Sequence, residues 1–126
     1  MNKKIIKTDK ACLPVGPYNQ AVSIENLVYT AGQIPLDKQG NMVPGGIKEQ
    51  TEQVIANLKT VLEATGSSLE KAVKATVFLK DLNDFTGMNE VYAKYFSAAT
   101  APARTTIQVA RIPKDSLVEI EIVAYI

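Results

Sequence analysis

Residues 47–65 constrain the fold most strongly, because they form one long amphipathic stretch. Apolar side chains and threonine methyl groups recur there at helical spacing on one face, and the opposite face is charged and polar. The apolar face comprises Ile47, Thr51, Val54, Ile55, Leu58, Val61, Leu62 and Thr65. Gly66 follows at the position where glycine commonly ends a helix. The sequence therefore predicts a helix over 47–65 that must pack against an apolar surface.

Segments on both sides of this helix alternate with a period of two, which is typical of strands. A hairpin over 20–30, with Glu25 and Asn26 in its turn, precedes the helix. The other predicted strands are 4–8, 73–80, 104–110 and 117–126, and a second helix is predicted over 81–96. The order of these elements predicts an α+β fold, in which two helices pack on one face of a mixed sheet.

The sheet face without helices is expected to meet water or another subunit. In the strand 73–80, alternation places Val73 on the buried face and Phe78 on the opposite one. Tyr125 of the last strand is also expected on the helix-free face. Apolar side chains on an uncovered sheet face favour an oligomer.

The composition is that of one globular domain. The chain has 126 residues and 13.7 kDa, which fits a single domain over residues 1–126. Its net charge of +1 gives no reason to expect a nucleic acid or a membrane as partner. No apolar run reaches the roughly 20 residues of a membrane span or forms a signal peptide. Cys12 is the only cysteine, so no intrachain disulfide can form, and we expect a cytoplasmic protein.

The chain contains no histidine, which excludes most of the usual catalytic apparatus. A Ser-His-Asp triad, a Cys-His pair and an imidazole metal site are all impossible, and Cys12 has no histidine base to activate it. Any chemistry must therefore use a fixed positive charge, a carboxylate, a hydroxyl or the backbone. Arg104 fits the first of these, because a planar guanidinium donates two parallel hydrogen bonds to a carboxylate.

Arg104 and Glu121 lie on neighbouring predicted strands, where both can point to the helix-free face. In a functional interpretation, Arg104 binds a substrate carboxylate while Glu121 positions a water molecule. The alternative is a cross-strand ion pair, which contributes little when it is exposed. Glu119 is expected on the same face as Glu121, where two carboxylates suit either acid–base chemistry or a solvated strand.

Two further positions suit a ligand site but also have ordinary structural explanations. Tyr18 stands on a loop tightened by Gly16 and Pro17, where its ring can stack on a small ligand or simply pack. Gly32 ends a strand, where the missing side chain lets a ligand approach closely or marks a bulge. Neither feature identifies a ligand by itself.

Several segments follow one another in a recognisable pattern. They are Gly16–Val22, Tyr29–Pro35, Val77–Leu82, Pro102–Thr106, Val109–Asp115 and Glu119–Glu121. Together they resemble the Rid family of reactive intermediate deaminases, also called the YjgF or endoribonuclease L-PSP family. The resemblance covers essentially the whole chain, and the run from 102 to 121 is its most specific part.

The resemblance implies a chorismate-mutase-like α+β fold and a homotrimer whose sheets form an inner barrel, with ligand clefts at the subunit interfaces. It implies hydrolysis of 2-iminobutanoate and 2-iminopropanoate, the products of threonine and serine dehydratases, to 2-keto acids and ammonia. It also implies that no metal or organic cofactor takes part, and that the partners are small imino and keto acids.

The same resemblance gives roles to individual residues. Arg104 is similar to the family's carboxylate-binding arginine, and Glu121 to the acid that orders the attacking water. Tyr18 is similar to the tyrosine that closes the site, and Gly32 belongs to its wall. The backbone around Thr106 is expected to help hold the imine nitrogen or the water.

The chain departs from the family pattern at two positions of this site. Deaminases of the family often have serine where Ala31 stands and cysteine where Thr106 stands. Ala31 lacks a hydroxyl that can contact the substrate, whereas Thr106 can still act through its backbone. These departures bear on substrate range and rate more than on the class of reaction.

Two other functions are weighed against deamination. The same cleft can hold a 2-keto acid or a related metabolite without turnover and report it to a partner. An RNA-acting role, which some names of the family carry, is disfavoured by the +1 charge, the missing histidine and the lack of a recognisable carboxylate cluster.

Overall fold

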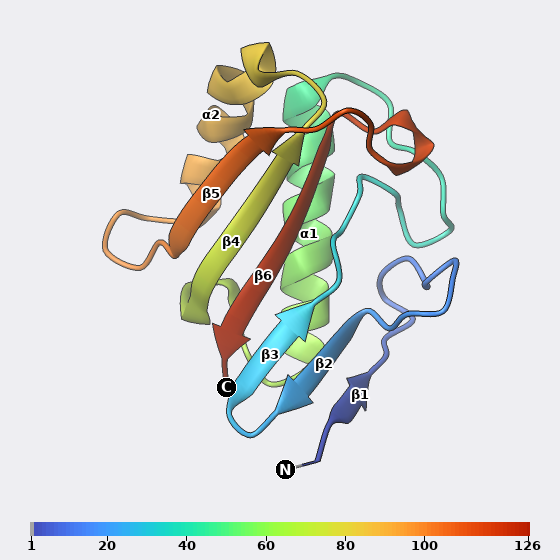
Figure 1. The fold of residues 1–126 in the computed structure, drawn as a ribbon, viewed down its shortest axis with the longest axis vertical. Coiled ribbons are helices and arrows are strands. Elements are labelled where there is room, and N and C mark those ends of the chain that lie inside the picture. The colour runs from blue at the N-terminus through green and yellow to red at the C-terminus, as the bar shows by residue number, and fades with distance from the viewer. Residues whose placement is uncertain (1) are drawn as a thin grey trace.

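The computed structural model describes residues 2–126, and its elements follow in the predicted order (Figure 1). The strands are β1 (Lys4–Ile6), β2 (Ala21–Ile24), β3 (Leu27–Thr30), β4 (Ala72–Leu79), β5 (Ala103–Gln108) and β6 (Val118–Tyr125). The helices are α1 (Ile47–Ala64) and α2 (Phe85–Tyr95), with short 3-10 turns at Leu69–Lys71, Leu82–Asp84 and Pro113–Asp115. The predicted α+β arrangement is confirmed, with element boundaries shifted by a few residues.

The strands form one six-stranded mixed sheet in the order β1-β2-β3-β6-β4-β5. All neighbouring pairs are antiparallel except β4 and β5, which run parallel and are joined through α2. A parallel pair needs such a crossover connection. The crossover leaves β5 at one edge of the sheet, so Arg104 and Thr106 lie on an edge strand.

Both helices cover the same face of the sheet, behind the strands in Figure 1. α1 buries the face that its spacing predicts, and Val54, Leu58 and Val61 are fully enclosed. They share one core with alternate residues of β4 and β6, such as Val77 and Ile120. Each such side chain contributes roughly 1.5–3 kcal/mol when buried. No helix within residues 2–126 combines the length and the apolar character that a membrane span needs.

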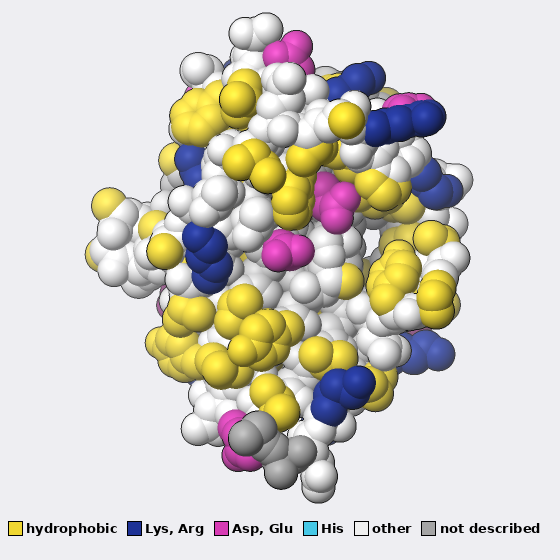
Figure 2. All heavy atoms as spheres, viewed as in Figure 1, with side chains coloured by type: hydrophobic (Ala, Val, Ile, Leu, Met, Phe, Trp, Pro, Cys, Tyr) yellow, Lys and Arg dark blue, Asp and Glu magenta, His cyan; other side chains and the backbone are white. Residues whose placement is uncertain are grey.

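The opposite face of the sheet carries no helix, as predicted, and Figure 2 shows apolar side chains gathered over it around acidic ones. Leu27 and Tyr29 of β3 are exposed there beside Tyr125 of β6, which is 46% exposed. Phe78 of β4 is half-buried on the same face. The expected positions of Phe78 and Tyr125 are therefore confirmed.

Val73 departs from the predicted alternation. The pairing of β4 with β6 shifts register between Ala72 and Lys74, which marks a bulge. The bulge turns Val73 outward, where 44% of its surface is exposed, and Ala72 takes the buried position instead. The prediction that Val73 lies on the buried face is wrong, because strict alternation holds only in a strand without an extra residue.

Candidate functional site

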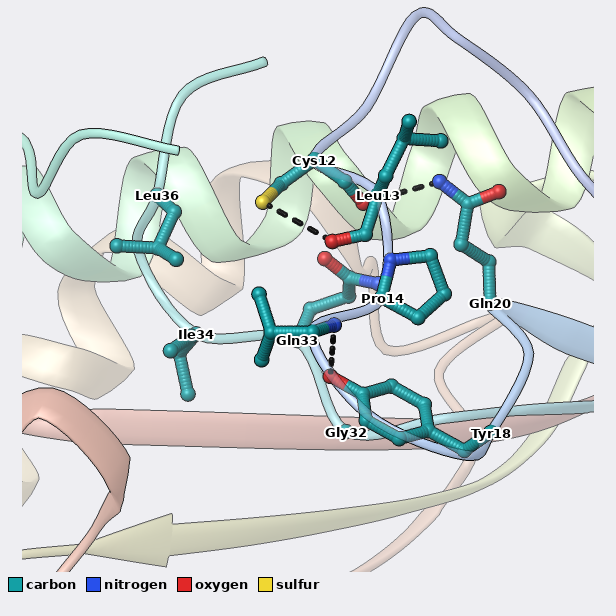
Figure 3. A pocket seen from close by; sticks show the side chains of 10 residues that line it. Cys12, Leu13, Pro14, Tyr18, Gln20, Gly32, Gln33, Ile34 and Leu36 are labelled. Atoms are coloured by element: carbon teal, nitrogen blue, oxygen red, sulfur yellow. Dashed lines mark hydrogen bonds between the residues drawn. The ribbon is translucent and has the colours of Figure 1, made fainter. Parts of the chain in front are cut away.

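A pocket opens between the loop after β1 and the segment after β3 (Figure 3). Its lining consists of Cys12, Leu13, Pro14, Val15, Tyr18, Gln20, Gly32, Gln33, Ile34 and Leu36. Two of the predicted site residues, Tyr18 and Gly32, therefore face the same hollow. The walls are mostly apolar with a few polar side chains among them, as in small-molecule sites, but the cavity volume of about 40 Å³ is too small to enclose a substrate by itself.

The buried side chain of Gln20 holds the loop that carries Tyr18. Its Nε2 donates to the carbonyl oxygens of Thr8 and Cys12, each at 3.0 Å, and its Oε1 accepts from the Thr8 N–H at 2.7 Å. The Tyr18 hydroxyl in turn accepts a hydrogen bond from the Val15 N–H at 3.4 Å, drawn in Figure 3. Tyr18 is nevertheless 50% exposed, so its ring is held by the loop and remains open to a ligand.

Replacing Gln20 by alanine is expected to lower the free energy of unfolding by roughly 1–3 kcal/mol, because buried backbone groups would lose their partner. Urea unfolding measures the change. Gln39→Ala is the matched control, since Gln39 is exposed and its side chain makes no hydrogen bond within residues 2–126. The control should change stability by less than about 0.5 kcal/mol. Equal losses in both variants would contradict the supporting role of Gln20.

Gly32 provides the space that a carboxylate of β6 occupies. A Cβ built on Gly32 would lie 2.8 Å from the Cδ of Glu119 and would collide with its Oε2. Glu119 therefore lies against Gly32, although it is not itself among the residues that line the pocket. Ala31 donates its N–H to the carbonyl oxygen of Gln20 at 2.9 Å and is not among the lining residues.

The two carboxylates of β6 differ in their surroundings. Glu119 is half-buried, and burial raises the pKa of its carboxyl group, with a further contribution from the negative charge of Glu121. Glu121 is exposed and lies in register with Thr76. A partly buried carboxyl with a raised pKa beside a pocket has the character of a group that exchanges protons. Glu119 has that character, although the sequence pattern favours Glu121.

Arg104 does not share a face with Glu121, which corrects the expectation from sequence. Arg104 is in register with Ala75, and Ala75 with Ile122, so these side chains point to the face that the helices cover. Glu121 is in register with Thr76 and points to the other face. Within residues 2–126 the two side chains form no ion pair. Strand alternation alone could not reveal this, because it does not fix the register between β5 and β4.

Arg104 lies against aromatic rings of α2 instead. Its guanidinium carbon is 4.6 Å from the centroid of the Tyr92 ring and 5.5 Å from that of Phe85. Both distances are within the range of a cation–π interaction. No acidic side chain within residues 2–126 pairs with this guanidinium. Arg104 is therefore a cation without a carboxylate partner among the residues that the structure describes.

Thr106 lies on the same face of β5 as Arg104, in register with Val77. The hydroxyl groups of Thr106 and Tyr92 are both buried, and neither has a hydrogen-bond partner among the described residues. Leaving such a group unsatisfied costs about 1–3 kcal/mol. Buried hydroxyls normally bond to another protein group or to water. The polar groups beside β5 therefore lack hydrogen-bond partners that a ligand, a water molecule or another chain would supply.

The site residues form two separate groups within one chain. The loop group consists of Tyr18, Gly32 and Glu119, and the edge group consists of Arg104 and Thr106. β4 lies between β6 and β5, so about 10 Å of sheet separates the two groups, which also differ in the face they use. A small substrate cannot contact both groups of the same chain.

Phe85 and Tyr92, the aromatic neighbours of Arg104, do not stand out in the sequence. They are seven residues apart, which places them on one face of a helix but indicates ordinary packing. The sequence could indicate these neighbours only through the topology of the fold. The helix that connects two parallel strands must pack across them, so residues on one of its faces contact those strands. Only the pairing of β4 with β5 brings this helix face to Arg104.

Comparisons with known proteins match nearly the whole chain. A family model described as endoribonuclease L-PSP matches residues 8–126. A RutC family protein of Pyrococcus abyssi is 53% identical over 126 residues, covering 99% of this chain and 98% of that protein. The 2-iminobutanoate/2-iminopropanoate deaminase of Mus musculus is 45% identical over 123 residues, covering 97% and 90%. The crystal structure of E. coli TdcF with bound serine has a TM-score of 0.91 and 42% identity, covering 98% of both chains. The chain therefore belongs to the endoribonuclease L-PSP family, as its sequence resemblance indicates.

Proposed function

We propose that this protein hydrolyses 2-imino acids to 2-keto acids and ammonia, and that 2-iminobutanoate and 2-iminopropanoate are among its substrates. The observation that carries the proposal is the guanidinium of Arg104, which has no carboxylate partner within residues 2–126. Such a group suits the carboxylate that all these substrates share. Relatives from mouse and cattle, each 45% identical, are named for this activity, which supports the same choice.

The proposed active form is a homotrimer in which the sheets form an inner barrel and each ligand cleft lies between two copies. The separation of the loop group from the edge group supports an interface site, because the β5 edge of one copy can complete the pocket of the next. Exposed apolar side chains on the helix-free face support its burial against other copies. Sedimentation velocity tests this assembly, and a monomer at micromolar concentration would contradict it.

The proposed reaction adds water to the C=N bond and then breaks that bond. The oxygen of water attacks the imine carbon, and both protons of that water pass to the nitrogen. The nitrogen then leaves as ammonia, and the oxygen remains as the ketone. The imine carbon is already electrophilic, so fixing the carboxylate and the water relative to each other supplies most of what the reaction needs. Arg104 binds the carboxylate, and Tyr18 closes the cleft over it.

A carboxylate accepts a proton from the attacking water and returns it to the departing nitrogen. The sequence resemblance gives this role to Glu121, but we propose Glu119. Glu119 is half-buried against Gly32 at the pocket, whereas Glu121 is exposed. In this arrangement Glu121 acts on Glu119 through its charge, which contributes to the raised pKa of Glu119.

The remaining predicted residues act through the backbone in this proposal. Gly32 supplies the wall of the cleft, and the backbone at Thr106 helps to hold the imine nitrogen or the water. Ala31 contributes no hydroxyl, and Thr106 stands in place of the cysteine that is frequent in the family. These two positions are expected to influence substrate range and rate.

A coupled assay tests the proposed function directly. Threonine dehydratase generates 2-iminobutanoate in the presence of semicarbazide, which traps the free imine. Adding this protein should accelerate the release of 2-ketobutyrate and reduce the yield of semicarbazone. No effect on this imine, and none on imines derived from other amino acids, would contradict the proposal.

Metabolite binding without turnover is the second candidate function. The solved structure of E. coli TdcF with bound serine favours it, because a relative of 42% identity holds a small carboxylate compound. Isothermal titration calorimetry with serine and with 2-ketobutyrate measures such binding. Binding together with no imine hydrolysis in the coupled assay would favour this function over deamination.

A further inference from the structure

The ring of Tyr92 is fixed in place beneath the side chain of Arg104. Tyr92 is only 7% exposed, and its ring centroid lies 4.4 Å from that of Phe96. The guanidinium carbon of Arg104 lies 4.6 Å from the centre of the same ring, closer than to Phe85 at 5.5 Å. The long side chain of Arg104 on this edge strand thus packs against a buried aromatic ring.

This contact leaves part of the guanidinium free to bind a carboxylate. An aromatic ring attracts a cation through its π face, and a guanidinium has five N–H donors, so donors remain for a carboxylate while the ring is in contact. Arginine carries about 2 kcal/mol of rotamer entropy, which it loses when a substrate fixes it. A ring that holds the side chain beforehand reduces that loss on binding.

We infer that Tyr92 is a positioning residue for Arg104, whose N–H edge it keeps directed toward a substrate carboxylate. The inference rests on the proposed function, in which Arg104 binds that carboxylate. It assigns the effect to the ring, whose centre lies 4.6 Å from the guanidinium carbon, although the Arg104 side chain also approaches the Tyr92 hydroxyl and helps to hold the pKa of that phenol down.

Kinetics of three variants test the role of the ring. Tyr92→Leu should raise the KM for 2-iminobutanoate and the Kd for 2-ketobutyrate about tenfold, with kcat nearly unchanged. Tyr92→Phe keeps the ring and should stay within about twofold of the wild type. Tyr95→Leu is the matched control, since Tyr95 lies on the same helix and bonds to Glu52 instead of Arg104. Thermal unfolding of each variant verifies that it is folded.

A second measurement tests the contact without any catalysis. Burial raises the pKa of the Tyr92 phenol, and both the charge of Arg104 and the approach of its N–H groups to the hydroxyl oppose that rise. Arg104→Gln should therefore raise this pKa further, which NMR of 13C-labelled tyrosine detects. The Tyr92 resonance is assigned by its absence from the spectrum of Tyr92→Phe.

The two measurements separate failure of the inference from failure of the proposed function. An unchanged Tyr92 pKa in Arg104→Gln would overturn the contact, whatever the protein catalyses. In an active wild type, Tyr92→Leu kinetics equal to those of Tyr95→Leu would overturn the positioning role. Equal losses in Tyr92→Phe and Tyr92→Leu would overturn it as well, since they would assign the effect to the hydroxyl. If the wild type neither hydrolyses imines nor binds 2-ketobutyrate, the proposed function fails and this inference fails with it.

Discussion

Replacing Arg104 by alanine is expected to abolish imine hydrolysis while leaving the oligomer intact. A bidentate pair with a carboxylate consists of two charge-assisted hydrogen bonds, and each contributes about 1.5–3 kcal/mol. Losing both should lower kcat/KM at least about 100-fold. The fold should survive, because Arg104 lies on an edge strand and pairs with no acidic side chain within residues 2–126. The semicarbazide assay measures the activity, and light scattering measures the mass.

Lys48→Ala is the matched control for this variant. Lys48 is also a cation, but it lies on α1 and forms an exposed ion pair with Glu90 at 2.6 Å. Exposed surface pairs of this kind contribute little to stability, so activity should stay near that of the wild type. Near-wild-type turnover in Arg104→Ala would rule out the proposal that Arg104 binds the substrate carboxylate.

Replacing Glu119 by glutamine should have the second largest effect. Glutamine keeps the size of the side chain but cannot accept the proton of the attacking water, so kcat should fall about 100-fold or more. The same change should stabilise the fold at neutral pH, because burial disfavours the ionised form of Glu119, as its raised pKa indicates. Below the ordinary pKa of glutamate this gain should vanish, since Glu119 is then protonated in both folded and unfolded chains. Turnover assays and urea unfolding at neutral and acidic pH measure both effects.

The variant Glu121→Gln distinguishes the two carboxylates. Activity should depend on ionised Glu119, so the wild-type rate should fall as the pH drops through the raised pKa of that group. Removing the charge of Glu121 lowers this pKa, so the acidic limb of the pH–rate profile should move to lower pH with kcat largely kept. Loss of activity in Glu121→Gln together with an active Glu119→Gln would reverse the assignment made here.

The fold could be predicted from the sequence because apolar residues recur at uninterrupted helical or strand spacing in most of its elements. The helix 47–65 and the strand 117–126 each show one uninterrupted pattern, and the structure contains them as Ile47–Ala64 and Val118–Tyr125. Helical and strand periods place side chains by local geometry alone, which a single sequence displays fully. The strand 73–80 follows less well, since the bulge at Val73 depends on how β4 pairs with β6.

The site could be predicted from the sequence less well than the fold, because its geometry depends on the register between strands and on the burial of individual side chains. Tyr18 and Gly32 line the same pocket, as expected if both contact one ligand. The faces of Arg104 and Glu121 are set by pairing across two strand boundaries, where a shift of one residue reverses the outcome. Glu119 resembles a solvated residue in the sequence, and only the space above Gly32 shows that its carboxylate is sheltered.

The contact between Gly32 and Glu119 also limits how such a site can change during evolution. Any side chain at position 32 would displace the carboxylate at position 119, since even a methyl group collides with it. The flexible end of the Glu119 side chain can turn aside, so a lineage that acquires a larger residue at position 32 either shortens residue 119 or loses the sheltered position of its carboxylate. These two positions should therefore covary among descendants that keep the chemistry, and drift independently only in those that have given it up.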